Sequence, residues 1–261
     1  MPAAGPTAAA LIIGNELLTG KVQEGNLIGL AKELRKLGVR LPRVVMIEDD
    51  VEVIVDEVRK LSAAHTYVFT SGGIGPTHDD VTLESVAKAF DQPIVRHAEL
   101  ARLLKTFYGE RCTEGHLRMA DVPRDVELVS ELEGPPDWDA VAARKAPWPT
   151  MLVKNVFVLP GIPQVFTMKI PAIIARLRRL DATPFVSCAL LTMMDEGHLK
   201  PLLDATVAAF ADVEIGSYPA WYGASYRTKL TFDGRDRARV EAARTDLEAK
   251  VAPADVVGRE G

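Results

Sequence analysis

Short apolar runs alternate with helix-like stretches along the first two thirds of the chain, and this alternation restricts the fold more than any other feature. Residues 8–13, 44–47 and 67–70 are largely apolar runs of the length typical of buried parallel strands. Between them, apolar residues recur at helical spacing after Gly25 and again after Asp50. Strands that alternate with helices predict an α/β fold, a doubly wound and mostly parallel sheet.

The alternation continues beyond the third strand and is then interrupted. We expect helices near 83–90, 97–108 and 163–179 and a strand near 151–159. Residues 121–150 contain five prolines, which predicts a long irregular insertion.

The last 80 or so residues have a different order of elements. The stretch LDATP at 180–184 is typical of a linker, which predicts one domain over 1–181 and a second over 182–261. The second domain is expected to be a smaller α+β domain with the order βαββαβ. Its expected elements are strand 185–193, helix 197–210, strand 213–217, strand 226–232, helix 235–249 and a short strand near 256–257.

Composition excludes several classes of protein. With 48% hydrophobic and 26% charged residues, the chain is typical of a globular protein, and its net charge of −5 argues against nucleic acid as a partner. No membrane-spanning run is present, and the N-terminus lacks the basic segment of a signal peptide. The two cysteines, Cys112 and Cys188, have neither a disulfide framework nor zinc-ligand spacing. We therefore expect a cytoplasmic protein that binds neither nucleic acid nor membrane.

Polar loops follow three of the predicted strands. They are GNELLTG at 14–20, EDD at 48–50 and TSGGIGPTHDDVT at 70–82. Because the carboxyl ends of parallel strands meet at one edge of a sheet, these loops predict a shared site. Simpler interpretations also apply, since the first loop fits a polar turn and Asp50 fits a helix cap. Asp49 has no evident capping role.

The third loop combines two features that conflict. Gly72, Gly73 and Gly75 permit positive φ and close backbone approach, so their N–H groups are suited to phosphate. Asp79 and Asp80 would repel the same phosphate unless a divalent cation lies between them. The alternative is that one of these aspartates caps the helix that follows.

The stretch TSGGIGPTHDDVT resembles the signature of the molybdopterin-binding (molybdenum-cofactor biosynthesis, MogA/MoaB-like) domain family, most closely its variant at the N-terminus of competence/damage-inducible CinA proteins. GNELLTG, Asn26, Asp49 and LPGIP at 159–163 resemble further parts of that variant, and the resemblance spans about residues 8–180. The chain leaves no room for the separate deamidase domain of many CinA proteins, so no deamidase activity is expected.

The resemblance implies chemistry at an adenylate-linked pyrophosphate. One branch of the family implies metal-dependent hydrolysis of ADP-ribose or FAD, and the other implies adenylyl transfer to molybdopterin. A third hypothesis is a non-catalytic nucleotide-binding module. The expected partner is a small-molecule nucleotide or pterin phosphate, the expected cofactor is a divalent metal of the Mg, Mn or Co type, and molybdopterin is the alternative ligand. The resemblance also implies a homo-oligomer, either a dimer or a trimer.

Carried over residue by residue, the resemblance implies a set of site residues. Asp80, Asp79 and Asp49 are the expected catalytic residues, and Asp80 and Asp79 the expected metal ligands. The expected substrate-binding residues are Gly14, Asn15, Glu16, Thr19, Asn26, Thr70, Ser71, Gly72, Gly73, Gly75, Thr77, His78, Pro160 and Gly161.

Three departures from the family pattern refine this prediction. Asp79 stands where the MogA-like signature has arginine, which favours the CinA-like branch. His78 stands where CinA proteins usually have lysine, which replaces a permanent cation by a titrating one. KAPWPTMLV at 145–153 lacks both glycines of the family's GTAPGF-like stretch, which weakens the molybdopterin alternative. Arg118 fits either an anion contact or a solvated helix charge.

Overall fold

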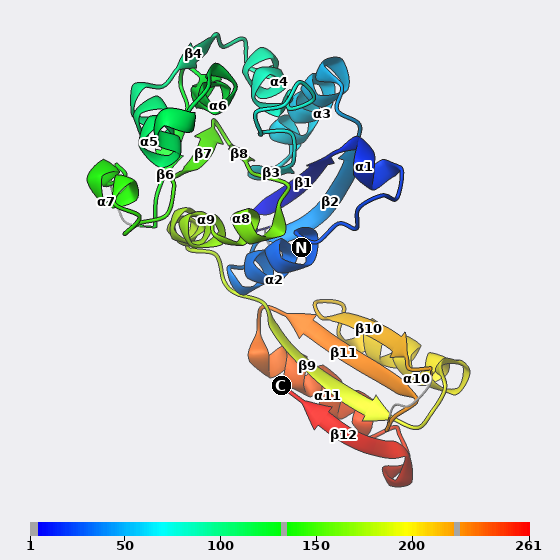
Figure 1. Cartoon of the computed structure of the whole chain (residues 1–261). Helices are drawn as coiled ribbons and strands as arrows, with labels where there is room; N and C mark the ends of the chain where they lie inside the picture. The colour runs from blue at the N-terminus through cyan, green and yellow to red at the C-terminus, as the bar shows by residue number, and fades with distance from the viewer. Residues whose placement is uncertain (1–4, 132–134, 222–224) are drawn as a thin grey trace. The chain divides into compact units, whose positions relative to one another are not determined.

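The computed structural model describes residues 5–131, 135–221 and 225–261, and the chain divides into two compact units (Figure 1). The first unit is Met1–Ala182 and the second is Thr183–Gly261. Within the described ranges, no helix is long and apolar enough to cross a membrane.

A six-stranded sheet forms the centre of the first unit, in the order β2-β1-β3-β8-β7-β6. The first four strands in this order are parallel, and β7 and β6 extend the sheet in antiparallel fashion. The doubly wound, mostly parallel sheet predicted from the alternation is therefore confirmed. The strands are β1 (Thr7–Ile13), β2 (Arg40–Ile47), β3 (Tyr67–Ser71), β6 (Glu127–Val129), β7 (Thr150–Val153) and β8 (Val156–Val158).

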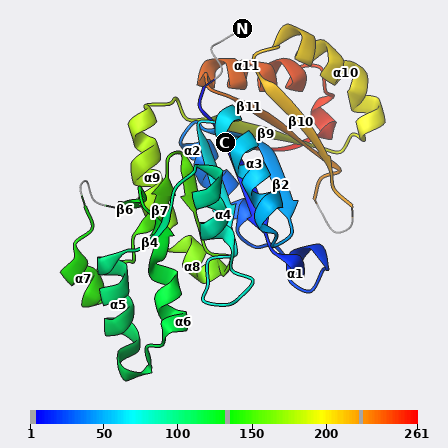
Figure 2. The same cartoon turned by 90° about the horizontal axis from the view of Figure 1, so that it is seen from above.

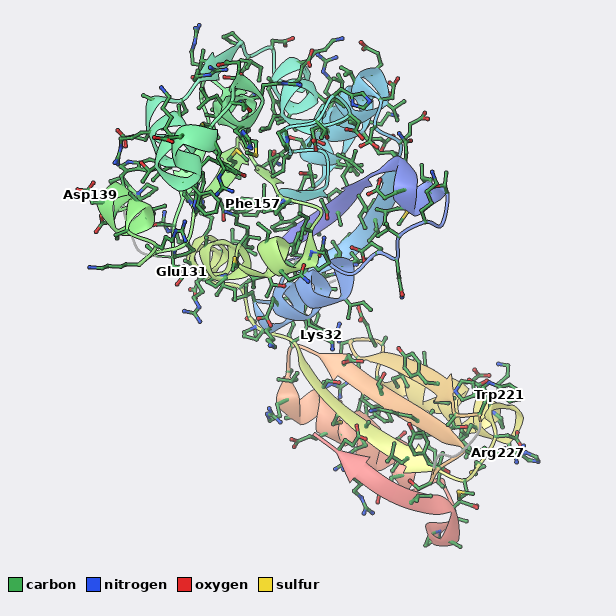
Figure 3. The ribbon with its side chains drawn as sticks, viewed as in Figure 1. Lys32, Glu131, Asp139, Phe157, Trp221 and Arg227 are labelled. Atoms are coloured by element: carbon green, nitrogen blue, oxygen red, sulfur yellow. The ribbon has the colours of Figure 1, made fainter. Side chains whose placement is uncertain are left out.

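Helices cover both faces of this sheet, as Figure 1 shows. Apolar side chains of α2, α8 and α9 pack with one face, and those of α3, α4 and α5 pack with the other. The sheet is buried between them, and Phe157 at its centre stacks on Phe69 with ring centroids 5.1 Å apart (Figure 3). The helices are α1 (Asn15–Leu18), α2 (Leu27–Lys36), α3 (Val51–Ala64), α4 (Thr82–Ala89), α5 (Ala98–Tyr108), α6 (Glu114–Leu117), α7 (Trp138–Ala142), α8 (Pro163–Thr167) and α9 (Ile170–Leu177).

Two predicted elements are divided in the structure. The strand expected near 151–159 is the hairpin of β7 and β8, which turns at Lys154 with φ 54°. The helix expected over 163–179 is divided into α8 and α9, because Pro171 near the start of α9 has no N–H to continue the helix of α8.

The predicted irregular insertion at 121–150 is partly regular, so that prediction was wrong in part. Its first residues, β5 (Asp121–Pro123), pair in antiparallel fashion with β4 (Ile94–Arg96). It also supplies β6 to the main sheet, and it contains α7. Strands of three residues are too short for a periodic pattern to reveal.

The second unit has the predicted βαββαβ order. Its strands form an antiparallel sheet in the order β10-β11-β9-β12, and α10 and α11 pack on one face of it (Figure 2). Leu190, Leu230 and Phe232 are fully buried in its separate core. The elements are β9 (Val186–Thr192), α10 (Glu196–Ala209), β10 (Glu214–Pro219), β11 (Thr228–Gly234), α11 (Arg237–Glu248) and β12 (Val256–Glu260).

Candidate functional site

The three polar loops meet at the carboxyl edge of the parallel strands. Asn15 N, just after β1, donates to Asp49 Oδ2, just after β2, over 2.8 Å. Gly72 N, just after β3, donates to the Leu159 carbonyl after β8 over 3.1 Å. The strand order thus brings together residues that lie far apart in the sequence.

The Asn26 side chain joins the loop after β3 to the loop after β8. Its side chain is 7% exposed, and its Nδ2 donates to Ser71 Oγ over 2.9 Å and to the Gly161 carbonyl over 2.8 Å. Asn26 N and Leu27 N are in turn capped by the Glu24 carboxylate. Asn26 therefore positions the β3 and β8 loops, and Glu24, which sequence reasoning missed, positions Asn26. The carboxylate two residues before the N-cap residue Asn26 was the available signal.

The glycine turn is held in a conformation that requires glycine. Gly72 and Gly73 have φ of 112° and 66°, and a Cβ on Gly72 would lie 2.1 Å from the Ile13 carbonyl oxygen. A Cβ on Gly73 would lie 2.3 Å from Thr82 Oγ1, and that hydroxyl donates to the Gly72 carbonyl. Thr82 is thus a second positioning residue that the predicted site lacked. Gly161 also needs to be small, since its Cβ would lie 3.3 Å from Gly72 Cα.

Backbone donors remain available in this turn. Gly72 N is used by the Leu159 carbonyl, whereas the N–H groups of Gly73 and Gly75 have no acceptor among the residues that the structure describes. Free N–H groups in a positive-φ turn are suited to phosphate oxygens. Thr70, by contrast, is fully buried and its hydroxyl bonds to the backbone of β8, so it supports the sheet and does not face this edge.

Asp79 and Asp80 share one hydroxyl. Thr77 Oγ1 lies 2.6 Å from Asp79 Oδ1 and 2.5 Å from Asp80 Oδ2, and Thr77 N also donates to Asp80 over 2.8 Å. The residue before α4 is Val81, and no side chain caps this helix. The capping alternative for the two aspartates is therefore wrong. Since one hydroxyl hydrogen satisfies only one of the two carboxylates, the pair retains acceptor capacity.

Glycine also lets the Asp80 carboxylate lie against the turn. A Cβ on Gly75 would lie only 2.6 Å from Asp80 Oδ2. Similarly, a Cβ on Gly14 would lie 2.6 Å from Glu16 Oε1. Both glycines thus make room for a carboxylate at the same edge of the sheet.

The acidic side chains at this edge act on one another electrostatically. Partial burial raises the pKa of the Asp49 carboxyl, and the negative charges of Glu16, Asp79 and Asp80 raise it further. The hydrogen bond from Asn15 N opposes this rise. The pKa of Asp79 is lowered, chiefly by the hydrogen bond from Thr77. Burial and the neighbouring negative charges therefore raise the pKa of Asp49 above its ordinary value.

The donor set fits a hard divalent cation only together with a ligand. Within the described ranges, no three His, Cys, Asp or Glu side chains form a group that could hold a metal. Mg²⁺, however, is usually bound by one or two carboxylates and completes its shell with water and substrate phosphate. Asp79 and Asp80 beside the glycine turn, whose free N–H groups are suited to phosphate, match that arrangement.

A histidine and an arginine border the acidic loop. His78 is almost fully exposed, and its Nδ1 lies 3.9 Å from Asp79 Oδ1. Arg118 Nη1 lies 3.5 Å from the Thr77 carbonyl oxygen, so Arg118, for which the sequence left two roles open, lies beside the loop.

Two further predicted residues lie in the loops after β1 and β8. Thr19 caps the short helix α1 through its bond to the Asn15 carbonyl, and Pro160 precedes Gly161 in the β8 loop.

Comparison with known proteins defines the class to which this fold and edge belong. The chain belongs to the probable molybdopterin binding domain family, whose model matches residues 9–179. The family expected from the glycine and aspartate motif is thereby confirmed. Residues 184–260 match a second model, the middle domain of FAD synthase.

Particular relatives extend this result. The chain is 32% identical to a protein of Archaeoglobus fulgidus over 236 residues, covering 90% of this chain and 94% of the relative. It is 31% identical over 267 residues to a probable FAD synthase of Caenorhabditis elegans, covering 94% of this chain but only 50% of that protein. The chain thus spans half the length of this relative.

A solved structure supports the CinA-like resemblance. The crystal structure of the protein CinA from Thermoplasma acidophilum, described as of unknown function, superposes with a TM-score of 0.56 at 25% identity. The match covers 66% of this chain and 98% of the other.

Proposed function

We propose that this protein is a divalent-metal-dependent hydrolase of a nucleotide pyrophosphate of the ADP-ribose or FAD type. The observation that carries the proposal is the Asp79–Asp80 pair on Thr77, next to free backbone N–H groups of the glycine turn. Carboxylates and anion donors side by side are suited to a phosphate that arrives with its cation.

In this proposal the glycine turn binds the pyrophosphate and the acidic loop holds the cation. The N–H groups of Gly73 and Gly75 donate to phosphate oxygens, and Arg118 pairs with a phosphate charge. Asp80 and Asp79 would hold the divalent ion, which would neutralise phosphate charge and polarise the phosphorus centre.

Asp49 is the proposed general base. Its raised pKa makes it a stronger base than an ordinary aspartate, and its Oδ2 is oriented by Asn15 N. Asp49 takes a proton from water, the water oxygen forms a bond to phosphorus, and the bridging P–O bond breaks. AMP and a second phosphate monoester leave, and Asp49 passes its proton to the leaving phosphate oxygen or to solvent, so atoms and charge balance without a further reactant.

The second unit and its relatives favour a flavin or adenine nucleotide as substrate. Residues 184–260 match the middle domain of FAD synthase, and one relative is named a probable FAD synthase.

The segment at 145–153, which lacks the family's glycines, is held by Lys169. The Nζ of Lys169 donates to the carbonyls of Trp148 and Pro149 over 2.9 and 3.0 Å.

Molybdopterin binding with adenylyl transfer is the second candidate function. The description of the family model that matches residues 9–179 supports it. In that case the same edge of the sheet would bind a pterin phosphate and a nucleotide, and no water would be activated. A non-catalytic nucleotide-binding module is the third candidate.

The test is AMP release from ADP-ribose and from FAD, each with Mg²⁺, Mn²⁺ or Co²⁺ and each with chelator. We expect metal-dependent AMP release from at least one of the two substrates. Formation of adenylated molybdopterin from ATP and molybdopterin, without AMP release from either pyrophosphate, would support the second candidate. Nucleotide binding with neither reaction would support the non-catalytic module.

A further inference from the structure

The segment that precedes β7 lies at the same edge of the sheet as the glycine turn. β7 runs antiparallel to β8, with Met151 opposite Val158. The start of β7 therefore lies beside the end of β8, where the Leu159 carbonyl accepts a hydrogen bond from the glycine turn. Trp148 comes shortly before β7 and thus reaches this edge, and Lys169 Nζ holds it there through its carbonyl oxygen.

Trp148 belongs to an aromatic cluster at the end of α5. The Phe107 ring meets the Tyr108 ring edge-on with centroids 5.0 Å apart, and the Trp148 ring edge-on with centroids 6.4 Å apart. Tyr108 and Trp148 are half-buried and pack against the apolar core that α3, α4 and α5 share. Phe107, by contrast, is 48% exposed. The cluster is therefore a rigid support for one outward-facing ring.

Arg144 adds a cation to this ring. Its guanidinium carbon lies 4.9 Å from the centre of the Phe107 ring, within the range of a cation–π contact. Arg144 has no carboxylate partner in the part of the chain that the structure describes. Its N–H groups are therefore available to a ligand. A flat heteroaromatic ring that carries carbonyl oxygens suits both features, because it stacks on an aromatic ring and accepts hydrogen bonds at its rim.

A row of contacts connects this cluster to the acidic loop. Arg118 Nη1 lies 3.5 Å from the Thr77 carbonyl oxygen, and α6 directly precedes Arg118. Within α6, the His116 ring packs on the Tyr108 ring with centroids 4.0 Å apart, and α5 and α6 lie side by side (Figure 2). A ligand ring on Phe107 is therefore several side chains away from a phosphate at the glycine turn.

We propose that Phe107 and Arg144, supported by Trp148, form a subsite for the isoalloxazine ring of FAD, so that FAD binds in preference to ADP-ribose. The two nucleotides share their adenylate half, but only FAD has a second flat ring. An open ribityl chain joins this ring to the pyrophosphate and is longer than the furanose that carries adenine, so it suits a ring that lies away from the phosphate. The inference rests on the proposed function, because it names which of the proposed substrates the site takes.

The first test compares kcat/KM for FAD and for ADP-ribose, measured as AMP release, in the parent and two variants. We expect the parent to prefer FAD. Phe107→Ala should lower kcat/KM for FAD about tenfold, because one stacked ring is lost, and should leave that for ADP-ribose unchanged. Ile28→Ala is the matched control, since Ile28 is 68% exposed on α2, which packs on the other face of the sheet, and it should change neither value.

The second test measures binding without cleavage. FMN carries the isoalloxazine ring but no pyrophosphate bond, and its binding can be followed by flavin fluorescence. We expect Phe107→Ala to raise the Kd of FMN about tenfold and to leave the Kd of AMP, measured by calorimetry, unchanged. Phe107→Leu retains apolar bulk but lacks a flat ring, so it should give the same result if Phe107→Ala lowers Tm.

Three results would overturn the subsite. One is a parent whose kcat/KM for ADP-ribose equals or exceeds that for FAD. Another is a folded Phe107→Leu variant that retains the FMN affinity of the parent. The third is an equal loss for FAD and ADP-ribose in a folded Phe107 variant, which would place the shared adenine on this ring. If neither nucleotide releases AMP, the proposed hydrolase fails, and the Kd of FMN in the parent and in Phe107→Leu alone decides on the subsite.

Discussion

Asp49 at the sheet edge and Asp212 in the second unit have opposite electrostatic surroundings. In the second unit, Asp212 forms two hydrogen bonds with Arg239, at 2.9 and 2.7 Å, and this pairing lowers the pKa of Asp212. At the sheet edge, Asp49 is surrounded by other acidic groups, and its pKa is raised. Acidic residues that only stabilise a fold acquire cationic partners, whereas acidic residues that converge without one are suited to a ligand that brings a cation.

The largest effect should come from removing one charge of the aspartate pair. Asp80→Asn retains the size and an acceptor for Thr77 N but removes the charge that a hard cation needs. We expect AMP release to fall at least about 100-fold with Tm close to that of the parent. Asp212→Asn in the second unit is the matched control and should leave AMP release unchanged. Equal AMP release by Asp80→Asn and the parent would assign the cation to another group.

A smaller loss should follow from crowding the same carboxylate. Gly75→Ala places a Cβ 2.6 Å from Asp80 Oδ2, so the carboxylate must move. We expect AMP release to fall about tenfold, since misplaced catalytic groups lose much of their rate. Gly29→Ala is the control, because a Cβ there meets nothing within 4 Å and alanine favours helix α2. The proposed role of Asp80 would be contradicted if Gly75→Ala kept full activity at limiting metal.

Much of the fold and of the site at the sheet edge could be predicted from the sequence, because both depend on local patterns. Periodicity predicted the longer strands and helices, and the place of the three polar loops after parallel strands predicted that they meet. The hydroxyl of Thr77 that Asp79 and Asp80 share could not be predicted, since the same sequence is equally compatible with a helix cap by either aspartate. Thr82 and Arg118 act through contacts that only the folded chain defines. The same holds for Gly73, which is required by packing against Thr82 as well as suited to phosphate.

The pH dependence of turnover should reflect Asp49. As a general base, Asp49 acts in its ionised form, so kcat should decrease as pH falls through its raised pKa. Asp49→Asn should lower kcat and remove this acidic limb. Measurement of kcat at saturating metal and substrate separates this effect from cation binding. If kcat of Asp49→Asn decreases at low pH as it does in the parent, the acidic limb belongs to another group.

Lys169 predicts a pH effect on stability that is separate from catalysis. Burial lowers its pKa to about 8, so between about pH 8 and 10.5 the unfolded chain binds a proton that the folded chain does not. This residue's contribution to the free energy of unfolding should therefore rise with pH across that window, by up to about 3 kcal/mol. Lys169→Met should remove that rise in denaturant titrations. Identical pH dependence in both proteins would contradict the burial of a charged Lys169.

The smallest effect should come from the paired acid of the second unit. The Asp212 and Arg239 side chains are about half exposed, so their ion pair is screened by solvent. Asp212→Ala should lower the free energy of unfolding by less than about 1 kcal/mol in denaturant titrations and should not change AMP release. A loss of AMP release in a folded variant would remove the distinction between the two kinds of carboxylate.

The most direct test of the central claim is Mn²⁺ binding followed by electron paramagnetic resonance, with and without AMP, in the parent and in Asp80→Asn. The account predicts that AMP tightens Mn²⁺ binding to the parent, because carboxylates and phosphate share the ion. It predicts that this tightening is lost in the folded Asp80→Asn variant. Mn²⁺ binding that is the same in both proteins, or that AMP leaves unchanged in the parent, would contradict a cation held between the aspartate pair and phosphate.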